Sequence, residues 1–361
     1  MSVAVLRLCA PELAPMWRRL QAAGGVSTPF LAWEWFSALA EQPELSRSVR
    51  VVAVRRPGEP EAGLFPLELV RGPRGRRTVR CAGTDKLGAD HLDVVALPAD
   101  RGAVAAAVAR YLARSLRWDA ADLEGLAADG ALARALRDEL RLPRCLPHRS
   151  EVESVPVVAL RGEEADAVRA RLRRRCARGL KSAQRAGGGF SVVDDPDQVG
   201  ALVESLMDMH NARFQCESVV FSTPALRTFH VTAVTRLAAA GMARVCRLST
   251  ATDDIALEYV LMMGDRAYSY QSGFRPDGGH SPGRTVMCQA MLVAAEEGRA
   301  EYDLLRGDES YKAEYATGNR PDVRIRALQP TVRAVAWGTI LLLRRVARVA
   351  RRRWGAGDGG H

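Results

Sequence analysis

The alternation of apolar and polar positions divides the chain into two halves of similar plan. In the first half, the aromatic and apolar residues after Thr28 predict a helix that runs to about Glu41. Two β-rich runs follow at 49–55 and 62–70, and the Pro- and Gly-containing residues between them predict a hairpin. The remaining elements of this half are a helix near 103–116, a strand at 120–123 and a helix near 131–140.

The second half repeats the order of helix, hairpin and further elements. A helix is expected from Phe221 to about Ala240, and a basic helix at 168–185 precedes it. Strands are expected at 243–249, 255–263, 267–274 and 301–305, with a helix at about 284–297 before the last of them. This repetition predicts an α/β fold with mixed sheets (α+β), built as two tandem modules.

We divide the chain into a first module, 1–155, and a second module, 156–330. Residues 331–354 carry an apolar stripe and many arginines, which predicts a basic amphipathic helix. Such a helix either packs on the domain or lies on an anionic membrane surface. Residues 355–361 are expected to form a disordered tail.

Length and composition are those of a globular protein with two cores. The chain has 361 residues, 47% of them hydrophobic, and no run approaches the roughly 20 apolar residues of a membrane span. The N-terminal residues lack the pattern of a signal peptide, so we expect a cytoplasmic protein, which the tail helix would bring to the inner membrane face. The seven cysteines form no Cys-x-x-Cys pair and the six histidines show no ligand spacing, so we expect no metal.

The net charge of +10 is concentrated in part on the predicted helix at 168–185. Eight basic residues and no acidic residue fall between 169 and 185, and several of them share one helical face. One interpretation is a solvated surface. The other is a docking face for a phosphate-bearing substrate, an acyl carrier protein or tRNA.

A Gly-rich loop between strand 267–274 and the next helix has the features of an anion site. Ser281 suits the N-cap of this helix, Pro282 its first position, and Gly283 permits close approach to the backbone. The unpaired N–H groups at a helix N-terminus attract anions, and Arg284 would add a charged donor. The loop matches neither a Walker loop nor a dinucleotide-binding fingerprint, and it needs no ligand as a plain connection.

The segment from Tyr302 to Lys312 is the most distinctive in the chain. A short apolar strand runs directly into Arg306, Gly307, Asp308 and Glu309. Charged residues at a strand end are typical of ligand sites in α/β proteins. Lysine occurs only at positions 86, 181 and 312 among 52 basic residues, which marks Lys312 as a position where arginine does not substitute.

Taken together, residues from about 163 to 315 resemble the GNAT acyltransferase superfamily, in the branch of cellulose-biosynthesis-type or acetyltransferase-6 domains. The resemblance rests on the basic helix, the His210–Phe214 segment, the hairpin with Ile255 and Ala256, the 270–274 strand, the 281–283 turn and the 302–312 motif. The first half resembles the degenerate first module of double-domain proteins of this kind. Fem-type aminoacyl transferases share that tandem architecture.

The resemblance implies transfer of an acyl group from acyl-CoA, with acetyl-CoA as the expected co-substrate and no permanently bound cofactor, to an amine. In GNAT proteins a loop of the form Arg/Gln-x-x-Gly-x-Gly/Ala holds the pyrophosphate. Here Gly278, Gly279, Ser281, Gly283 and Arg284 occupy that place, and the full motif is absent. An acyl carrier protein or an aminoacyl-tRNA is the alternative donor, the latter as in a Fem-like transferase. A third interpretation is a non-catalytic GNAT-like module that binds an acyl carrier or envelope machinery.

Three residues are candidates for the proton transfer. Glu258 lies among apolar strand residues, where burial would raise the pKa of its carboxyl and suit it to act as the base; the competing interpretation is an outward-facing strand residue. His210 has the pKa range of a proton shuttle, or packs as an ordinary helix residue. Asp303 at the end of the last strand is the third candidate.

Further residues are expected to bind the acceptor or to organise the site. They are Arg213, Tyr270, Arg306, Glu309, Tyr311 and Lys312. The competing interpretation is structural: Arg306 and Lys312 pair with the nearby carboxylates. We expect Asp308 to cap a short helix.

Overall fold

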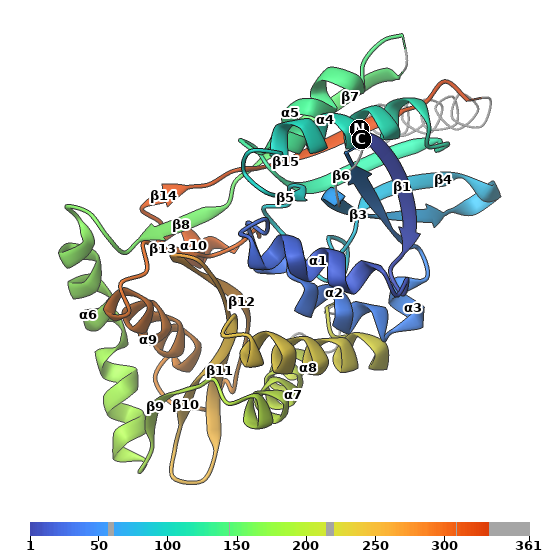
Figure 1. The fold of residues 1–361 in the computed structure, drawn as a ribbon. Helices are drawn as coiled ribbons and strands as arrows, with labels where there is room; N and C mark the ends of the chain where they lie inside the picture. The colour runs from blue at the N-terminus through green and yellow to red at the C-terminus, as the bar shows by residue number, and fades with distance from the viewer. Residues whose placement is uncertain (57–60, 144, 214–219, 308, 332–361) are drawn as a thin grey trace, which may run out of the picture.

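The structure is a computed structural model that describes residues 1–56, 61–143, 145–213, 220–307 and 309–331. Two sheets lie side by side, each covered by its own helices (Figure 1). Within the described residues, no helix is both long and apolar enough to cross a membrane. The predicted turn at 57–60, the cap Asp308 and the tail from 332 to 361 lie outside the described residues.

The first sheet has one parallel pair, β4 with β6, among otherwise antiparallel neighbours. In spatial order its strands are β1 (Ser2–Arg7), β2 (Val49–Arg55), β3 (Glu61–Arg71), β4 (Arg77–Cys81), β6 (Ala120–Ala127), β15 (Asp322–Leu328) and β7 (Leu146–Glu153), with β5 (Val95–Ala96) paired to β3. The predicted hairpin of 49–55 and 62–70 is confirmed by the antiparallel register of β2 and β3.

The second sheet repeats this pattern, with β12 and β13 as its parallel pair. Its strands in spatial order are β14 (Gly318–Asn319), β8 (Pro156–Ala159), β13 (Glu301–Asp303), β12 (Arg266–Phe274), β11 (Asp254–Met263), β10 (Ala243–Ser249) and β9 (Gly189–Val193). Both sheets have the same order of strand directions. Counted from β1 in the first sheet and from β9 in the second, four strands are antiparallel to one another, the fifth is parallel to the fourth, and the sixth is antiparallel to the fifth. The predicted duplicated α/β fold is therefore confirmed.

Helices cover both faces of the second sheet. The helices α6 (Ala165–Arg185) and α9 (Pro282–Glu296) pack on one face, and α7 (Pro196–Arg213) and α8 (Pro224–Ala239) on the other (Figure 1). Alternate residues of β11 face these layers, so Leu257 and Tyr259 belong to one core and Ala256 and Val260 to the other. The other helices are α1 (Leu13–Ala22), η1 (Pro29–Leu31), α2 (Trp33–Ala40), α3 (Pro43–Ser46), η2 (Pro73–Gly75), α4 (Arg101–Arg114), α5 (Ala131–Glu139) and α10 (Ser310–Ala313).

The chain crosses between the two sheets near both ends of the second unit. After β14 it returns to the first sheet, where β15 lies between β6 and β7. The module boundaries at 155 and 330 stay a prediction. The strand at 322–328, which we assigned to the second module, pairs within the first sheet. This return ties the first unit to the segment that follows the 302–312 motif.

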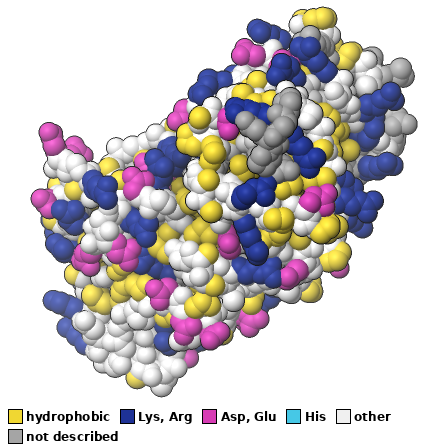
Figure 2. Space-filling model, viewed as in Figure 1, with side chains coloured by type: hydrophobic (Ala, Val, Ile, Leu, Met, Phe, Trp, Pro, Cys, Tyr) yellow, Lys and Arg dark blue, Asp and Glu magenta, His cyan; other side chains and the backbone are white. Residues whose placement is uncertain are grey.

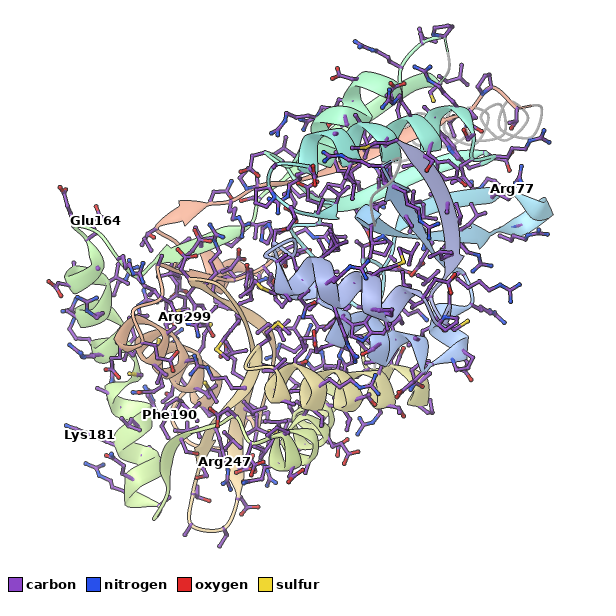
Figure 3. The ribbon with its side chains drawn as sticks, viewed as in Figure 1. Arg77, Glu164, Lys181, Phe190, Arg247 and Arg299 are labelled. Carbon is purple, nitrogen blue, oxygen red and sulfur yellow. The ribbon has the colours of Figure 1, made fainter. Side chains whose placement is uncertain are left out.

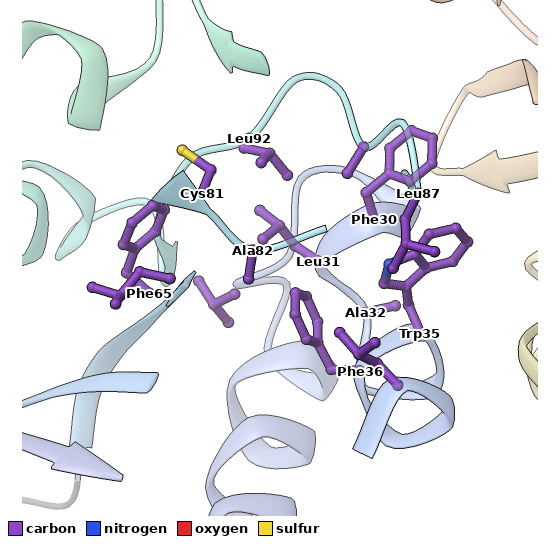
Figure 4. Close-up of a cluster of buried hydrophobic side chains, with 14 of the residues drawn as sticks. Phe30, Leu31, Ala32, Trp35, Phe36, Phe65, Cys81, Ala82, Leu87 and Leu92 are labelled. Atoms are coloured by element: carbon purple, nitrogen blue, oxygen red, sulfur yellow. The ribbon is translucent and has the colours of Figure 1, made fainter. Parts of the chain in front are cut away.

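Aromatic side chains form the contact between the two units. Phe30 and Trp35 are part of the buried core of the first unit, and both lie at one side of the cluster drawn in Figure 4. Trp35 packs edge-to-face on Phe229, with ring centroids 4.9 Å apart, and on Tyr270 at 5.5 Å. Since one buried cluster contains residues of both units, their relative position is fixed by packing.

His230 is the titratable member of this cluster, and we predict that it makes the protein acid-sensitive. Its ring is fully buried beside Phe221 and Phe229, and burial lowers its pKa to about 3. The unfolded chain takes up a proton near pH 6.5 while the folded protein does not. The free energy of unfolding should therefore fall, by up to about 1.4 kcal/mol per pH unit, as the pH drops from 6 to 4.

Melting temperatures at pH 7 and pH 5 test this prediction. In His230→Phe the loss between the two pH values should shrink. His280→Gln is the matched control, because His280 is exposed and its replacement should leave the loss unchanged. An equal loss in His230→Phe and the wild type would contradict the prediction.

Candidate functional site

The candidate site lies where two paired strands separate. Strands β12 and β13 run in parallel register as far as Tyr268 and Asp303. Beyond this point a cavity of about 570 Å³ opens between them, and residues 269–272 of one strand and 304–306 after the other line it. The two strands do not pair with each other beyond this point, and the walls of the cavity combine apolar side chains with a few polar groups.

Most of the predicted site residues meet at this cavity. Those that line it are His210, Arg213, Tyr270, Ser281, Gly283, Arg284, Arg306, Glu309, Tyr311 and Lys312. Glu258, Asp303, Gly278 and Gly279 do not line it. The two glycines line a separate cavity of about 300 Å³ beside Ser182 near the end of α6.

Glu258 lies directly behind the cavity wall. Its side chain is fully buried, and Oε1 accepts hydrogen bonds from Ser269 Oγ at 2.7 Å and Tyr302 Oη at 2.8 Å. Oε2 has no hydrogen-bond partner among the described residues. Burial raises the pKa of this carboxyl to about 7, because the two hydrogen bonds offset only part of the desolvation.

Ser269 connects this carboxylate to the cavity. Its hydroxyl donates to Glu258 and the residue also lines the cavity. The sequence pointed to Glu258 through its apolar neighbours, but it offered no signal for Ser269, because serine in a strand is common. The pair forms a path along which a proton can leave the cavity.

His210 and Arg213 enter the cavity from the last turn of α7. The His210 Nδ1 atom lies 3.2 Å from the carbonyl oxygen of Ser272, and burial lowers the pKa of the imidazole. The Arg213 guanidinium lies over the ring of Phe274, 4.7 Å from its centroid. Gly273 permits this approach of α7, because a Cβ there would lie 2.5 Å from the carbonyl oxygen of Leu206.

Tyr270 contributes its ring rather than its hydroxyl. The hydroxyl donates to the carbonyl oxygen of Leu87 in the first unit, at 2.9 Å. The ring packs against Phe30 and Trp35. Tyr270 therefore joins the cavity wall to the interface between the units.

The N-terminus of α9 borders the cavity, as the sequence predicted. The helix begins at Pro282 with Ser281 as its N-cap, and Ser281 has the left-handed backbone conformation, with φ of 49°. The amides of Gly283 and Arg284 lie in the first turn, where backbone N–H groups lack helical partners. A side chain at position 283 would collide with the Phe274 ring, since a Cβ there would lie 2.5 Å from it.

A basic cleft of about 290 Å³ adjoins the same helix end. Four arginines of α6 line it together with His280, Ser281 and Arg284; they are Arg171, Arg174, Arg175 and Arg178. Arg175 pairs with Glu314 at 2.7 Å, while Arg174, Arg178 and Arg284 make no ion pair within the described part of the chain. Because the cleft shares Ser281 and Arg284 with the cavity, the two spaces meet at the start of α9.

The outer face of α6 continues this basic surface. Lys and Arg side chains recur along the margin of the molecule where α6 lies (Figure 2), and Lys181 projects outward there (Figure 3).

Gly179 lets the helix approach α9 closely, because a Cβ on it would lie 1.9 Å from Thr285 Oγ1 and 2.7 Å from the carbonyl oxygen of His280.

Asp303 and Arg306 bind residues of the first unit. Asp303 is fully buried, and its Oδ2 atom lies 2.9 Å from Nε2 of His91. Arg306 pairs with Asp90 through its Nε atom and with Glu153 at 2.9 Å. Arg306 thus pairs with carboxylates, as the structural interpretation expected, but they are distant in the chain and not those of its own motif. Asp303 is buried and does not line the cavity.

The sequence did not single out Asp90 and His91. Together with Asp93 they are the charged or polar side chains of a short, mostly apolar run from Leu87 to Ala96, and such residues inside an apolar run are a signal of buried pairing. Their partners lie more than 200 positions away in the chain, so no local pattern identifies them.

Lys312 fixes the segment that it follows. Its Nζ atom donates to the carbonyl oxygens of Leu305, at 3.2 Å, and Arg306, at 2.7 Å, and pairs with Glu309 at 3.0 Å.

Among the described residues no group of three or more His, Cys, Asp or Glu side chains is arranged to hold a metal ion.

Known proteins share this fold and part of its sequence. Residues 170–313 match the family model Acetyltransf_6, an acetyltransferase (GNAT) domain. No protein of curated function matches the chain.

Three solved structures are similar over nearly the whole chain. The C-terminal domain of a putative lysylphosphatidylglycerol synthetase from Agrobacterium fabrum has a TM-score of 0.56 at 12% identity, over 91% of this chain and 96% of that one. FemX gives 0.54 at 12% identity, over 91% and 97%. The L-PGS structure from Bacillus licheniformis gives 0.52 at 12% identity, over 95% and 98%.

The matched domain and the fold define the class of protein. The second unit carries a GNAT domain, and the chain is an acyltransferase. At 12% identity the three structures show a shared fold of two units and no more than that.

The contact at Gly179 gives a stability prediction. Gly179→Ala should lower the free energy of unfolding by about 1–3 kcal/mol, because the added methyl group forces α6 away from the start of α9. Gly102→Ala is the control: Gly102 lies in α4 with open space around it, so alanine should stabilise by up to about 1 kcal/mol. Urea unfolding measures both, and equal effects of the two substitutions would refute the tight contact.

Proposed function

We propose that this protein transfers an acyl group from an acyl-CoA thioester to an amine. The observation that carries the proposal is the junction of an apolar cavity with a basic cleft at the N-terminus of α9. An acyl-CoA has the same division, with a thioester on an uncharged arm at one end and phosphates at the other. The GNAT domain match supports the same assignment.

In this proposal the cleft holds the phosphates. The amides of the first turn of α9 and the guanidinium groups of Arg178 and Arg284 would donate to the phosphate oxygens. Leu304, Met287 and Phe274 would line the path of the acyl-bearing arm, since they form part of the cavity wall.

The reaction needs an acceptor for one proton. The amine nitrogen attacks the thioester carbonyl carbon, the C–N bond forms and the C–S bond breaks, and the sulfur leaves as thiolate and is protonated by water. The proton lost by the amine would pass through Ser269 to the carboxylate of Glu258. Glu258 would then release it to solvent, which offsets the proton that the thiolate takes from water and regenerates the base. A carboxyl with a pKa of about 7 is suited to this step near neutral pH.

A second candidate is transfer from an aminoacyl-tRNA. The row of basic residues on α6 favours it, because the row continues past the cleft through Lys181 to Arg185. Arg185 lies seven residues beyond Arg178, about 10 Å along the helix. A pyrophosphate in the cleft needs no charge at that distance, whereas an RNA backbone would follow the whole row.

Charge reversals on α6 separate the two candidates. For acyl-CoA, Arg178→Glu should weaken binding of acetyl-CoA about 10- to 100-fold, through loss of a charged hydrogen bond and repulsion of the phosphate. Arg185→Glu is the matched control on the same helix and should change the affinity by less than about twofold. Titration calorimetry measures both.

Failure of the folded wild type to bind acetyl-CoA or longer acyl-CoAs would refute the acyl-CoA proposal. Binding of tRNA that weakens steeply with salt, and equally in Arg178→Glu and Arg185→Glu, would establish the second candidate instead.

The proton path gives a prediction of its own. Glu258→Gln should lower the rate of acyl transfer by about 10²–10⁴-fold with acetyl-CoA affinity unchanged. In the wild type the rate should rise with pH through about 7, because the base works only when deprotonated. Mass spectrometry of cell extracts with labelled acetyl-CoA measures product formation.

Ser269→Ala should share part of this loss. Ser272→Ala is the control. Ser272 lines the same cavity, but His210 contacts its backbone carbonyl oxygen, which the substitution leaves in place. A Glu258→Gln enzyme with wild-type rate and pH profile would remove Glu258 from the mechanism.

A further inference from the structure

Two adjacent residues of the first unit hold one wall of the cavity in the second. His91 Nε2 lies 2.9 Å from Asp303 Oδ2, and His91 Nδ1 lies 2.8 Å from Asp322 Oδ1. Asp90 accepts a hydrogen bond from the backbone amide of Arg306 at 2.8 Å and pairs with its guanidinium. Both ends of the segment 303–306 are therefore bound to the same turn of the first unit.

That segment has a conformation it would not adopt alone. Leu305 has a φ of 57°, in the left-handed region, which is unfavourable for a residue with a Cβ. Its amide donates to Asp303 Oδ1 at 2.8 Å, and the Lys312 ammonium binds its carbonyl oxygen. These contacts fix a backbone that would otherwise relax, and Leu305 lines the cavity.

The charges around His91 favour its imidazolium form. It faces the carboxylates of Asp303 from β13 and Asp322 from β15, and Asp90 precedes it; Arg306 and Arg320 are the nearby cations. Burial disfavours the charged ring, but the two carboxylates outweigh it and raise the His91 pKa to about 10. A doubly protonated ring donates a hydrogen bond from Nδ1 to Asp322 Oδ1 and forms an ion pair through Nε2 with Asp303 Oδ2.

We propose that His91, with Asp90, is a positioning residue of the donor site. It acts through Asp303 and Arg306, which set the path of Leu304 and Leu305 along the cavity between β12 and β13. The first unit therefore contributes to the geometry of the donor site in the second unit. This inference rests on the proposed acyl-CoA-dependent function.

A contact elsewhere between the units supplies the comparison. Arg236 of α8 pairs with Glu41, the residue that follows α2, on the surface of the interface. This ion pair links the same two units but touches neither the cavity nor the segment 303–306. Its loss should affect the interface alone.

The test compares acetyl-CoA affinity in full-length variants, well below their melting temperatures. His91→Gln should weaken binding about tenfold or more, because one amide cannot donate to two carboxylates and its oxygen repels one of them. Glu41→Gln, the control, should stay within about twofold. Asp90→Asn is a second, isosteric variant that should also weaken binding.

A rescue separates positioning from general destabilisation. In the double variant His91→Gln, Asp303→Asn, the asparagine can donate to the glutamine oxygen and still accept from the Leu305 amide. Its acetyl-CoA affinity should recover to within about threefold of the wild type, even where its melting temperature stays lowered.

The outcomes are distinct. If the wild type binds acetyl-CoA and both folded single variants bind within twofold of it, the inference is wrong and the proposed function stands. If His91→Gln weakens binding and the double variant does not recover, positioning through Asp303 is wrong. If the folded wild type binds no acyl-CoA, the proposed function fails, and this inference with it.

Discussion

The buried charges at the junction of the two units constrain most of this structure. Asp90, His91, Asp303 and Asp322 are each nearly or completely buried, in a protein whose remaining charge lies mainly at the surface. Removing charges from water costs several kcal/mol each, and the cost is offset only when every partner is held in place. The turn at Asp90, the end of β13 and the start of β15 must therefore meet in one arrangement. The return of β15 to the first sheet is part of that requirement.

The cavity takes its character from the same junction. Strand β13 ends at Asp303, which is bound by His91 of the first unit. The chain therefore separates from β12 at a fixed point, and the cavity opens there. The inner wall is apolar at Leu304 and Met287, and the outer end meets the arginines of α6. The proposed donor requires an apolar space beside a basic one. The helices α6 and α9 and the end of β13 together provide both.

Local features of the fold were predictable from the sequence. The hairpin of β2 and β3 follows from turn residues, and the start of α9 follows from Pro282 at the first helical position, signals that act over a few positions. Ser281 stands at the N-cap position, but its side chain makes no capping hydrogen bond. Glu258 was recognisable because a carboxylate among apolar strand residues is unusual. The structure confirms its burial, and its role as base stays a proposal.

Contacts between distant parts of the chain were not predictable. Asp303 was expected in the chemistry, yet its partner is His91; Tyr270 was expected at the substrate, yet its hydroxyl binds Leu87. Gly278 and Gly279 were expected beside the donor, and they line another cavity. In each case the residue type indicated a polar role, but the partner is set by how the two units pack, which periodicity and turn signals do not encode.

Hydrogen exchange with and without acetyl-CoA tests most directly whether the cavity between β12 and β13 is the donor site. We expect slower exchange on ligand binding in three places: the first turn of α9, the last residues of β12 and the segment 304–306. Protection confined to other parts of the protein, with acetyl-CoA bound, would contradict it.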